Sequence, residues 1–212
     1  MSYSSIIVYN NNRKKVDMSK LKIGIFLGTF DPIHNGHISI ARNLTNELDK
    51  VIIVPLYDAP HKDETISSAA VRLQMCRVAL LGEKNIEVTD EIIRHQIEGY
   101  DIDIIHQLKK AYKDAELHYI LGSDVFNHIL SWPSVHELES LVSFSVILRE
   151  KEDLPASKKV IKQLNCPCKI HEMALEGISS TMIRHGIKNK LLVSRFLHPD
   201  ILSIIKSNNL YK

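Results

Sequence analysis

The sequence lacks the features that mark several classes of protein. It contains no run of about 18 apolar residues, so we predict no transmembrane helix. Residues 1–20 are polar and lack the long apolar core of a secretory signal peptide. Three cysteines in 212 residues are too few for a disulfide framework. These absences favour a cytoplasmic protein with no membrane partner.

An excess of charge of one sign is also missing. The 27 Lys and Arg residues nearly balance the 25 Asp and Glu residues, which leaves a formal net charge of +2. Proteins dedicated to nucleic-acid binding usually carry a basic face, so this balance argues against a nucleic-acid partner. It leaves room for a local basic pocket that binds a phosphorylated small molecule.

Two of the cysteines, Cys166 and Cys168, lie close together, with His171 nearby. Cysteine ligands of zinc are usually separated by at least two residues, and here only one residue separates them. A single Cys-x-Cys is therefore weak support for a metal site. We favour a turn that leads into a strand.

Short apolar runs alternate along the chain with longer segments of helical periodicity. The apolar runs predict strands, and the amphipathic segments predict helices between them. The predicted strands are residues 21–28, 51–55, 117–122, 142–148 and 169–173, and the predicted helices are residues 36–48, 69–81, 102–112 and 199–207. This alternation indicates an α/β fold with a doubly wound, Rossmann-like parallel sheet. We expect one domain over residues 21–212, preceded by a loose extension over residues 1–20.

The segment GTFDPIHNGH, residues 28–37, joins the first predicted strand to the first predicted helix. Gly28 and Gly36 let a ligand come close to the backbone. His34 and His37 lie three residues apart at the start of the helix, so they share a face there. Free N–H groups at a helix N-terminus attract anions, and imidazole donors strengthen such a site. The pattern favours a phosphate site over a zinc site or a structural coincidence.

A second segment, GISSTMIR at residues 177–184, precedes another helical stretch. Ser and Thr commonly cap helices. Arg184 lies about one turn further along, where its guanidinium can reach back to an anion. On its own, the segment is best interpreted as a plain capped helix start. Beside the first segment, it becomes a second candidate for phosphate binding.

The first segment, with the pattern Gly-x-Phe-Asp-Pro-x-His-x-Gly-His, resembles the signature of the nucleotidyltransferase superfamily. The second, Ile-Ser-Ser-Thr-x-Ile-Arg, is similar to that of the bacterial nicotinate-mononucleotide adenylyltransferases. The likeness runs from residue 22 to residue 211 and includes residues 59–62, residues 121–124 and Trp132. It implies transfer of the adenylyl group of ATP to nicotinate mononucleotide. The products would be deamido-NAD and pyrophosphate, a step of NAD biosynthesis.

The resemblance also implies which residues form the site. It assigns catalysis to His34, His37 and Arg184. It assigns ATP binding to Gly28, Thr29, Phe30, Gly36, Lys62, Gly122, Asp124, Ile178, Ser179, Ser180 and Thr181. It assigns mononucleotide binding to Asp31, His61, Tyr100, Asp101 and Trp132. Mg²⁺ is expected to arrive with ATP, and no residue is assigned as a metal ligand.

One position departs from the family pattern. Where the family has Ser-Tyr-Thr-x-Asp-Thr, this chain has GYDIDI at residues 99–104, so that Asp101 replaces a Thr. A carboxylate beside the substrate carboxylate is unfavourable unless it turns away. Nicotinamide mononucleotide, or another phosphorylated acceptor, therefore stays open as the substrate.

Two alternatives belong to other functional classes. A nucleotide-sensing module would bind ATP or NAD without turnover. An RNA-binding relative of the fold would bind RNA in a salt-dependent manner, and the balanced charge argues against it. The sequence leaves open whether the protein forms a homo-oligomer.

Overall fold

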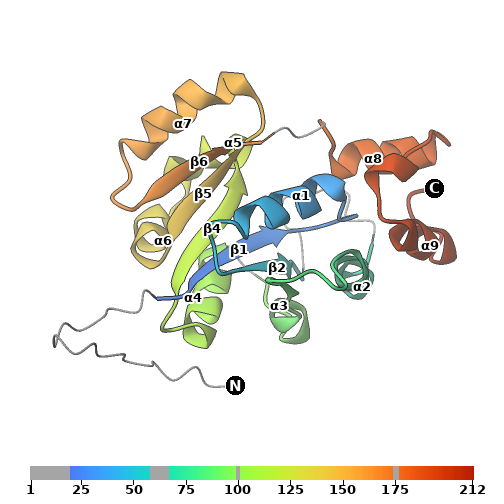
Figure 1. Ribbon diagram of the computed structural model, residues 1–212, viewed down its shortest axis with the longest axis horizontal. Coiled ribbons are helices and arrows are strands. Elements are labelled where there is room, and N and C mark those ends of the chain that lie inside the picture. The colour runs from blue at the N-terminus through green and yellow to red at the C-terminus, as the bar shows by residue number, and fades with distance from the viewer. Residues whose placement is uncertain (1–19, 58–66, 99–100, 174–176) are drawn as a thin grey trace, which may run out of the picture.

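The computed structural model describes residues 20–57, 67–98, 101–173 and 177–212, which form a parallel sheet with helices on both faces (Figure 1). The strand order is β3-β2-β1-β4-β5-β6, and every paired neighbour is parallel. The strands are β1 Lys22–Gly28, β2 Lys50–Pro55, β3 Ile86–Val88, β4 Glu116–Gly122, β5 Ser143–Leu148 and β6 Cys168–Glu172. The order reverses between β1 and β4. In open α/β sheets of this type, ligands bind at the carboxyl ends of the strands beside that reversal.

The helices divide into two layers, one on each face of the sheet (Figure 1). One layer contains α1 Asn35–Leu44, α2 Ala69–Ala79, α8 Ser180–Lys188 and α9 Pro199–Ser207. The other contains α3 Glu91–Arg94, α4 Asp101–Ala111, α5 Ser123–Phe126, α6 Val135–Leu141 and α7 Leu154–Ile161. Three short 3₁₀ turns, η1 Ile129–Ser131, η2 Lys151–Asp153 and η3 Ser194–Phe196, complete the described elements. No helix in these described ranges is both long and apolar enough to cross a membrane.

The apolar periodicity of the sequence explains why these elements form. Every residue of β2 from Val51 to Pro55 is buried, as expected for a strand covered by helices on both faces. In α1, Ile38, Ala41 and Leu44 recur at helical spacing and face the core. The two hydrophobic clusters on the two faces thereby hold the carboxyl ends of the strands in fixed register.

The structure confirms the predicted α/β class and parallel sheet, and each predicted strand lies within one residue or so of an observed one. The helix predicted over residues 36–48 ends at Leu44 instead. Leu48 is nonetheless buried, so its apolar character reflects packing in the turn after the helix. The strand β3 was not predicted because three residues are too short to show a period. Residues 1–19 lie outside the described residues, so the boundary at residue 20 stays a prediction.

Candidate active site

The turn between β1 and α1 is buried from Thr29 to His34 and folds back on itself. Phe30 has a positive φ of 50°, which turns its ring toward the end of β1. A Cβ atom at Gly28 would lie 2.8 Å from that ring, so this approach requires glycine. The turn therefore brings its backbone and the start of α1 to the carboxyl end of β1, next to the reversal of strand order.

His34 and His37 stack against each other at the start of α1. Their ring centroids are 3.7 Å apart and their planes differ by 23°. The backbone N–H of His34 donates to Nδ1 of His37 over 3.4 Å, and the ring of Phe30 meets His37 edge to face at 5.0 Å. These contacts fix both imidazoles at the N-terminal end of α1, as the spacing predicted.

His34 is neutral at physiological pH. Its side chain is buried, with 4% of the residue exposed, and burial lowers its pKa to about 4. The positive charge of Arg149 lowers the pKa further. A neutral imidazole keeps one N–H donor and one acceptor nitrogen. His34 can therefore donate a hydrogen bond to a phosphate oxygen without first gaining a proton.

The second motif lies directly against this turn. Ser179 caps α8 by accepting a hydrogen bond from the backbone N–H of Met182 at 3.1 Å, as predicted for a Ser at this position. Ser180 donates to the carbonyl oxygen of Pro32 at 2.9 Å. Arg184 donates to the carbonyl oxygen of Asp31 at 3.0 Å. The two segments singled out in the sequence therefore form one site.

The carboxylate of Asp31 is turned into the protein. Asp31 is 2% exposed, and its Oδ1 accepts a hydrogen bond of 2.6 Å from the hydroxyl of Tyr211. That hydroxyl in turn accepts a hydrogen bond of 2.9 Å from Ser67. Burial and the contact with Asp31 both raise the pKa of Tyr211. Asp31 was predicted to bind the mononucleotide, but in this structure its carboxylate links the turn to the C-terminal segment.

A buried arginine in α2 supports the turn from the other side. Arg72 is 1% exposed, and its guanidinium donates to three carbonyl oxygens, those of Thr29 at 2.7 Å, Tyr57 at 2.9 Å and Ser67 at 3.2 Å. It thereby ties the turn after β1 to the segment that follows β2. This role was not predicted, since an arginine in an amphipathic helix usually lies on the surface.

An ion pair lies across the carboxyl ends of β4 and β5. Arg149 Nε lies 3.0 Å from Asp124 Oδ1, and a Cβ atom at Gly122 would come within 2.3 Å of the same oxygen. Ser123 accepts a hydrogen bond from the backbone N–H of Arg149 at 3.0 Å and donates to Asp153 at 2.6 Å. Arg149 was not among the predicted site residues. Its position directly after a predicted strand, where ligands of such sheets bind, was the available signal.

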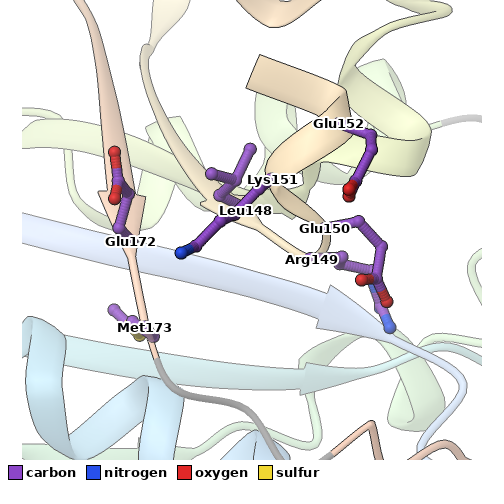
Figure 2. A pocket seen from close by; sticks show the side chains of 7 residues that line it. All are labelled: Leu148, Arg149, Glu150, Lys151, Glu152, Glu172 and Met173. Atoms are coloured by element: carbon purple, nitrogen blue, oxygen red, sulfur yellow. The ribbon is translucent and has the colours of Figure 1, made fainter.

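A hollow of about 510 Å³ opens beside this pair, between the ends of β5 and β6 (Figure 2). Its lining includes the carboxylates of Glu150, Glu152 and Glu172 and the apolar side chain of Met173. Lys151 extends between the two strand ends in the same view. Arg149 and Lys151 also line the hollow, but three carboxylates outnumber these two cations and disfavour a phosphate group here. The hollow suits an uncharged part of a ligand whose phosphates lie at α1.

Asp101 and Trp132 lie on the face of the sheet that α4 covers. The hydroxyl of Tyr119, a buried residue of β4, donates to the Asp101 carboxylate. This contact turns the carboxylate toward the sheet. Trp132 is partly buried and, like Tyr57, packs against the hydrophobic cluster on the same face.

Three predicted site residues, His61, Lys62 and Tyr100, lie outside the described residues. Ile178 packs against the cluster that contains α1 and α8. Cys166 lies just before β6 and Cys168 begins it, and both are free thiols at the opposite end of the sheet from the turn after β1. Across the described ranges, no group of three His, Cys, Asp or Glu side chains forms a ready metal site.

Comparisons of this chain with a family model and with curated relatives agree with one another. The family model described as cytidylyltransferase-like matches residues 25–186. A Clostridium novyi protein named "Probable nicotinate-nucleotide adenylyltransferase" is 33% identical over 198 residues, which cover 90% of this chain and 99% of the relative. A protein of the same name from Carboxydothermus hydrogenoformans is 32% identical and covers 92% of this chain and 100% of the relative.

A solved structure has the same fold. It is the nicotinic acid mononucleotide adenylyltransferase of Plasmodium falciparum complexed with NaAD, with a TM-score of 0.77. The two chains are 20% identical, and the likeness covers 90% of this chain and 97% of the other. A second structure of that protein, complexed with APC, gives a TM-score of 0.75.

The contact between Tyr211 and Asp31 predicts an effect on stability. Tyr211→Phe removes the hydroxyl that serves both Asp31 and Ser67, so we expect the free energy of unfolding to fall by about 1–2 kcal/mol. Urea unfolding followed by circular dichroism measures this change. Tyr112→Phe is the control, because Tyr112 is half-buried without a hydrogen bond from its hydroxyl to another described residue. An equal loss in both variants would contradict the assigned role.

The low pKa of His34 predicts how stability changes with pH. Unfolded His34 binds a proton below about pH 6.5, whereas the folded residue binds it only near pH 4. The contribution of neutral His34 to the free energy of unfolding is therefore fully present above about pH 6.5 and is lost as the pH falls toward 4. Between pH 7 and pH 5 the parent protein should lose about 2 kcal/mol more than His34→Gln does.

Urea titrations at the two pH values measure this difference. His128→Gln is the control, because His128 is exposed on the surface. Its loss of stability should follow that of the parent protein. The same pH dependence in the parent protein and in His34→Gln would show that His34 is not held neutral by burial.

Proposed function

Since this chain belongs to the cytidylyltransferase-like family and, within it, to the nicotinate-nucleotide adenylyltransferases, we propose that it transfers the adenylyl group of ATP to nicotinate mononucleotide. The products are deamido-NAD and pyrophosphate. The observation that carries this proposal is the meeting of two motifs at one turn. The imidazoles of His34 and His37 and the guanidinium of Arg184 converge there, although Arg184 lies 153 residues from Asp31, whose carbonyl it binds.

The reaction requires positioning and charge stabilisation more than covalent chemistry. The phosphate of the mononucleotide attacks the α-phosphorus of ATP. A new P–O bond forms, the bond to the β-phosphate breaks, and pyrophosphate leaves with the electron pair. His34 and His37 at the N-terminus of α1, with Lys62 and Arg184, are proposed to stabilise the negative charge that develops. Neutral His34 takes part as a hydrogen-bond donor.

The charged side chains at the carboxyl ends of the strands support one orientation of bound ATP. The phosphates lie against α1 and α8, and the nucleoside points to the hollow at β5 and β6, whose carboxylates disfavour phosphate (Figure 2). Asp124, which pairs with Arg149, can accept hydrogen bonds from the ribose hydroxyls. The residues proposed to contact ATP are Gly28, Thr29, Phe30, Gly36, Lys62, Gly122, Asp124, Arg149, Ile178, Ser179, Ser180 and Thr181.

The mononucleotide is proposed to contact His61, Tyr100 and Trp132. Asp31 and Asp101 leave this group as direct contacts and become positioning residues, because their carboxylates are held by Tyr211 and Tyr119. The contact between Tyr119 and Asp101 removes the objection that a carboxylate at position 101 disfavours nicotinate mononucleotide as the substrate. A carboxylate that faces β4 does not repel the nicotinate carboxylate.

Mg²⁺ is proposed to enter with ATP as part of the substrate, held by phosphate oxygens and water, which is its common mode of binding. The ion would draw negative charge from the transferring group. The proposed ligands are small nucleotides. A cytoplasmic location, the lack of a nucleic-acid partner and the oligomeric state stay predictions of the sequence.

Pyrophosphate release from Mg-ATP tests the proposal. Parallel reactions contain nicotinate mononucleotide, nicotinamide mononucleotide or neither. We expect release chiefly with the acid. Preference for nicotinamide mononucleotide would leave adenylyl transfer standing as the reaction and would refute nicotinate mononucleotide as the preferred substrate. ATP binding without release in any reaction would refute catalysis and favour a nucleotide-sensing module.

His37→Ala tests the proposed role of the imidazole pair. Loss of a donor to the developing charge should lower turnover on the order of 10²-fold, by analogy with removal of an oxyanion-hole donor. His128→Ala, which removes an exposed imidazole that is not assigned to the site, is the matched control. The same assay measures both variants. Turnover of His37→Ala within about twofold of the parent protein would refute the assignment.

A further inference from the structure

A pair of cysteines at the edge of the sheet has no part in the proposed reaction. Cys166 and Cys168 flank Pro167 where the chain enters β6. Figure 1 shows β6 at the edge of the sheet, reached by the connection from α7, and its neighbour is β5. The start of β6 lies at the amino ends of the parallel strands, whereas the candidate active site lies at their carboxyl ends. Any chemistry of this pair is therefore separate from adenylyl transfer.

The two cysteine side chains lie on the same face of the chain. Residues two apart in an extended segment point in the same direction, and both cysteines pack against the hydrophobic cluster on the face that α4 covers. The Sγ atom of Cys168 donates a hydrogen bond to the carbonyl oxygen of Cys166 at 3.4 Å. The thiol of Cys168 is therefore directed back toward Cys166.

The backbone around the pair is held by two other elements. Asn165 donates to the carboxylate of Glu139 in α6, from its backbone N–H at 2.8 Å and from its side-chain amide at 3.3 Å. The carbonyl oxygen of Pro167 accepts a hydrogen bond of 2.9 Å from the backbone N–H of Phe144 in β5. Two residues of extended chain span about 6.6 Å, which is near the upper limit of the Cα separation across a disulfide. A bond between the two sulfurs is therefore within reach, at the cost of some strain.

The two thiols have different acidities. The hydrogen bond between them lowers the pKa of Cys168 and raises the pKa of Cys166. Burial and the negative charge of Glu139 oppose the lowering at Cys168 without cancelling it. Because the thiolate is the nucleophile in thiol–disulfide exchange, Cys168 is the attacking residue and Cys166 the resolving one.

The third cysteine provides an internal comparison. Cys76 lies in α2 and is 0% exposed, and burial raises the pKa of its thiol. A buried thiol of this kind is inert. Cys166 and Cys168 are only half-buried, so small reagents can reach them.

We propose that Cys166 and Cys168 form a reversible redox site that exchanges with a low-molecular-weight disulfide such as oxidised glutathione. The thiolate of Cys168 attacks one sulfur of the small disulfide, so that a mixed disulfide forms and one small thiol leaves. The sulfur of Cys166 then attacks that of Cys168, and the second small thiol leaves. The two cysteines lose two electrons and two protons, which the two released thiols carry away.

The spacing of the pair favours a reversible bond over a structural one. Closing a very short loop restricts the unfolded chain less than closing a long one, so the disulfide adds comparatively little stability. Strained or exposed disulfides also have more oxidising potentials and are the labile ones. The bond should therefore form and break with the redox state of the surrounding thiol pool.

Peptide mapping of the native protein after incubation with oxidised glutathione tests the proposal. Remaining thiols are alkylated, and the protein is cut with trypsin and analysed by mass spectrometry. Trypsin cuts after Lys162 and Lys169, so one peptide, residues 163–169, carries both cysteines and is separate from Cys76. In most molecules this peptide should escape alkylation and be lighter by two hydrogen atoms. Dithiothreitol should restore both thiols, and Cys76 should stay a thiol throughout.

Two single variants separate the steps. Cys166→Ser keeps a hydroxyl donor beside Cys168 and removes the resolving thiol, so its reaction should stop at the mixed disulfide with glutathione. Cys168→Ser removes the attacking thiol, and it should react with oxidised glutathione severalfold more slowly than Cys166→Ser does. Cys76→Ala is the matched control, and it should form the bond between Cys166 and Cys168 as the parent protein does. Circular dichroism spectra like that of the parent protein would show that the variants fold.

Two outcomes would overturn the proposal. One is a peptide 163–169 that stays fully alkylated after incubation with excess oxidised glutathione. The other is glutathione on both cysteines of the parent protein with no bond between them. These measurements need no turnover, so absence of pyrophosphate release would refute the proposed reaction and leave the redox site standing. Normal release with an unreactive cysteine pair would do the reverse.

Discussion

The turn between β1 and α1 is buried without regular secondary structure, so its carbonyl groups need hydrogen-bond donors from elsewhere in the chain. Arg72 serves the carbonyl of Thr29, Ser180 that of Pro32 and Arg184 that of Asp31. Two of these donors are charged, and such hydrogen bonds typically contribute about 1.5–3 kcal/mol. The positions of the His34 and His37 imidazoles depend on these hydrogen bonds, because the turn ends at His34 and α1 begins directly after it.

This requirement explains why the site is assembled from distant segments. The donors come from α2, from α8 and from the C-terminal segment, where Tyr211 binds the Asp31 carboxylate. Each of these elements also packs on the face of the sheet that α1 covers. Core packing and the hydrogen bonds of the turn therefore reinforce each other. A rigid scaffold that carries preoriented donors is what adenylyl transfer requires, because most of its catalysis is positioning.

Local patterns in the sequence were enough to predict five of the six described strands, a helix that begins beside His34 and His37, and a Ser or Thr cap before the second helical stretch, since each depends on neighbouring residues. They were not enough for Arg72, Arg149 or Tyr211, whose roles arise only when distant segments meet. The directions of the Asp31 and Asp101 carboxylates were also beyond local reasoning. Each aspartate lies within a segment singled out in the sequence, yet its hydrogen-bond partner is a tyrosine in another part of the chain. The roles assigned to His61, Lys62 and Tyr100 stay predictions.

The bond between Asp31 and Tyr211 joins residues 180 positions apart. During synthesis the turn after β1 therefore leaves the ribosome long before its tyrosine partner exists. A growing chain can pair β1 with β2 early, but the turn gains its donors from α8 and from Tyr211 only after at least 148 further residues have been synthesised. In nascent chains the histidine pair therefore lacks these supporting contacts, and the order of synthesis delays assembly of the candidate site until α8 and Tyr211 have been added.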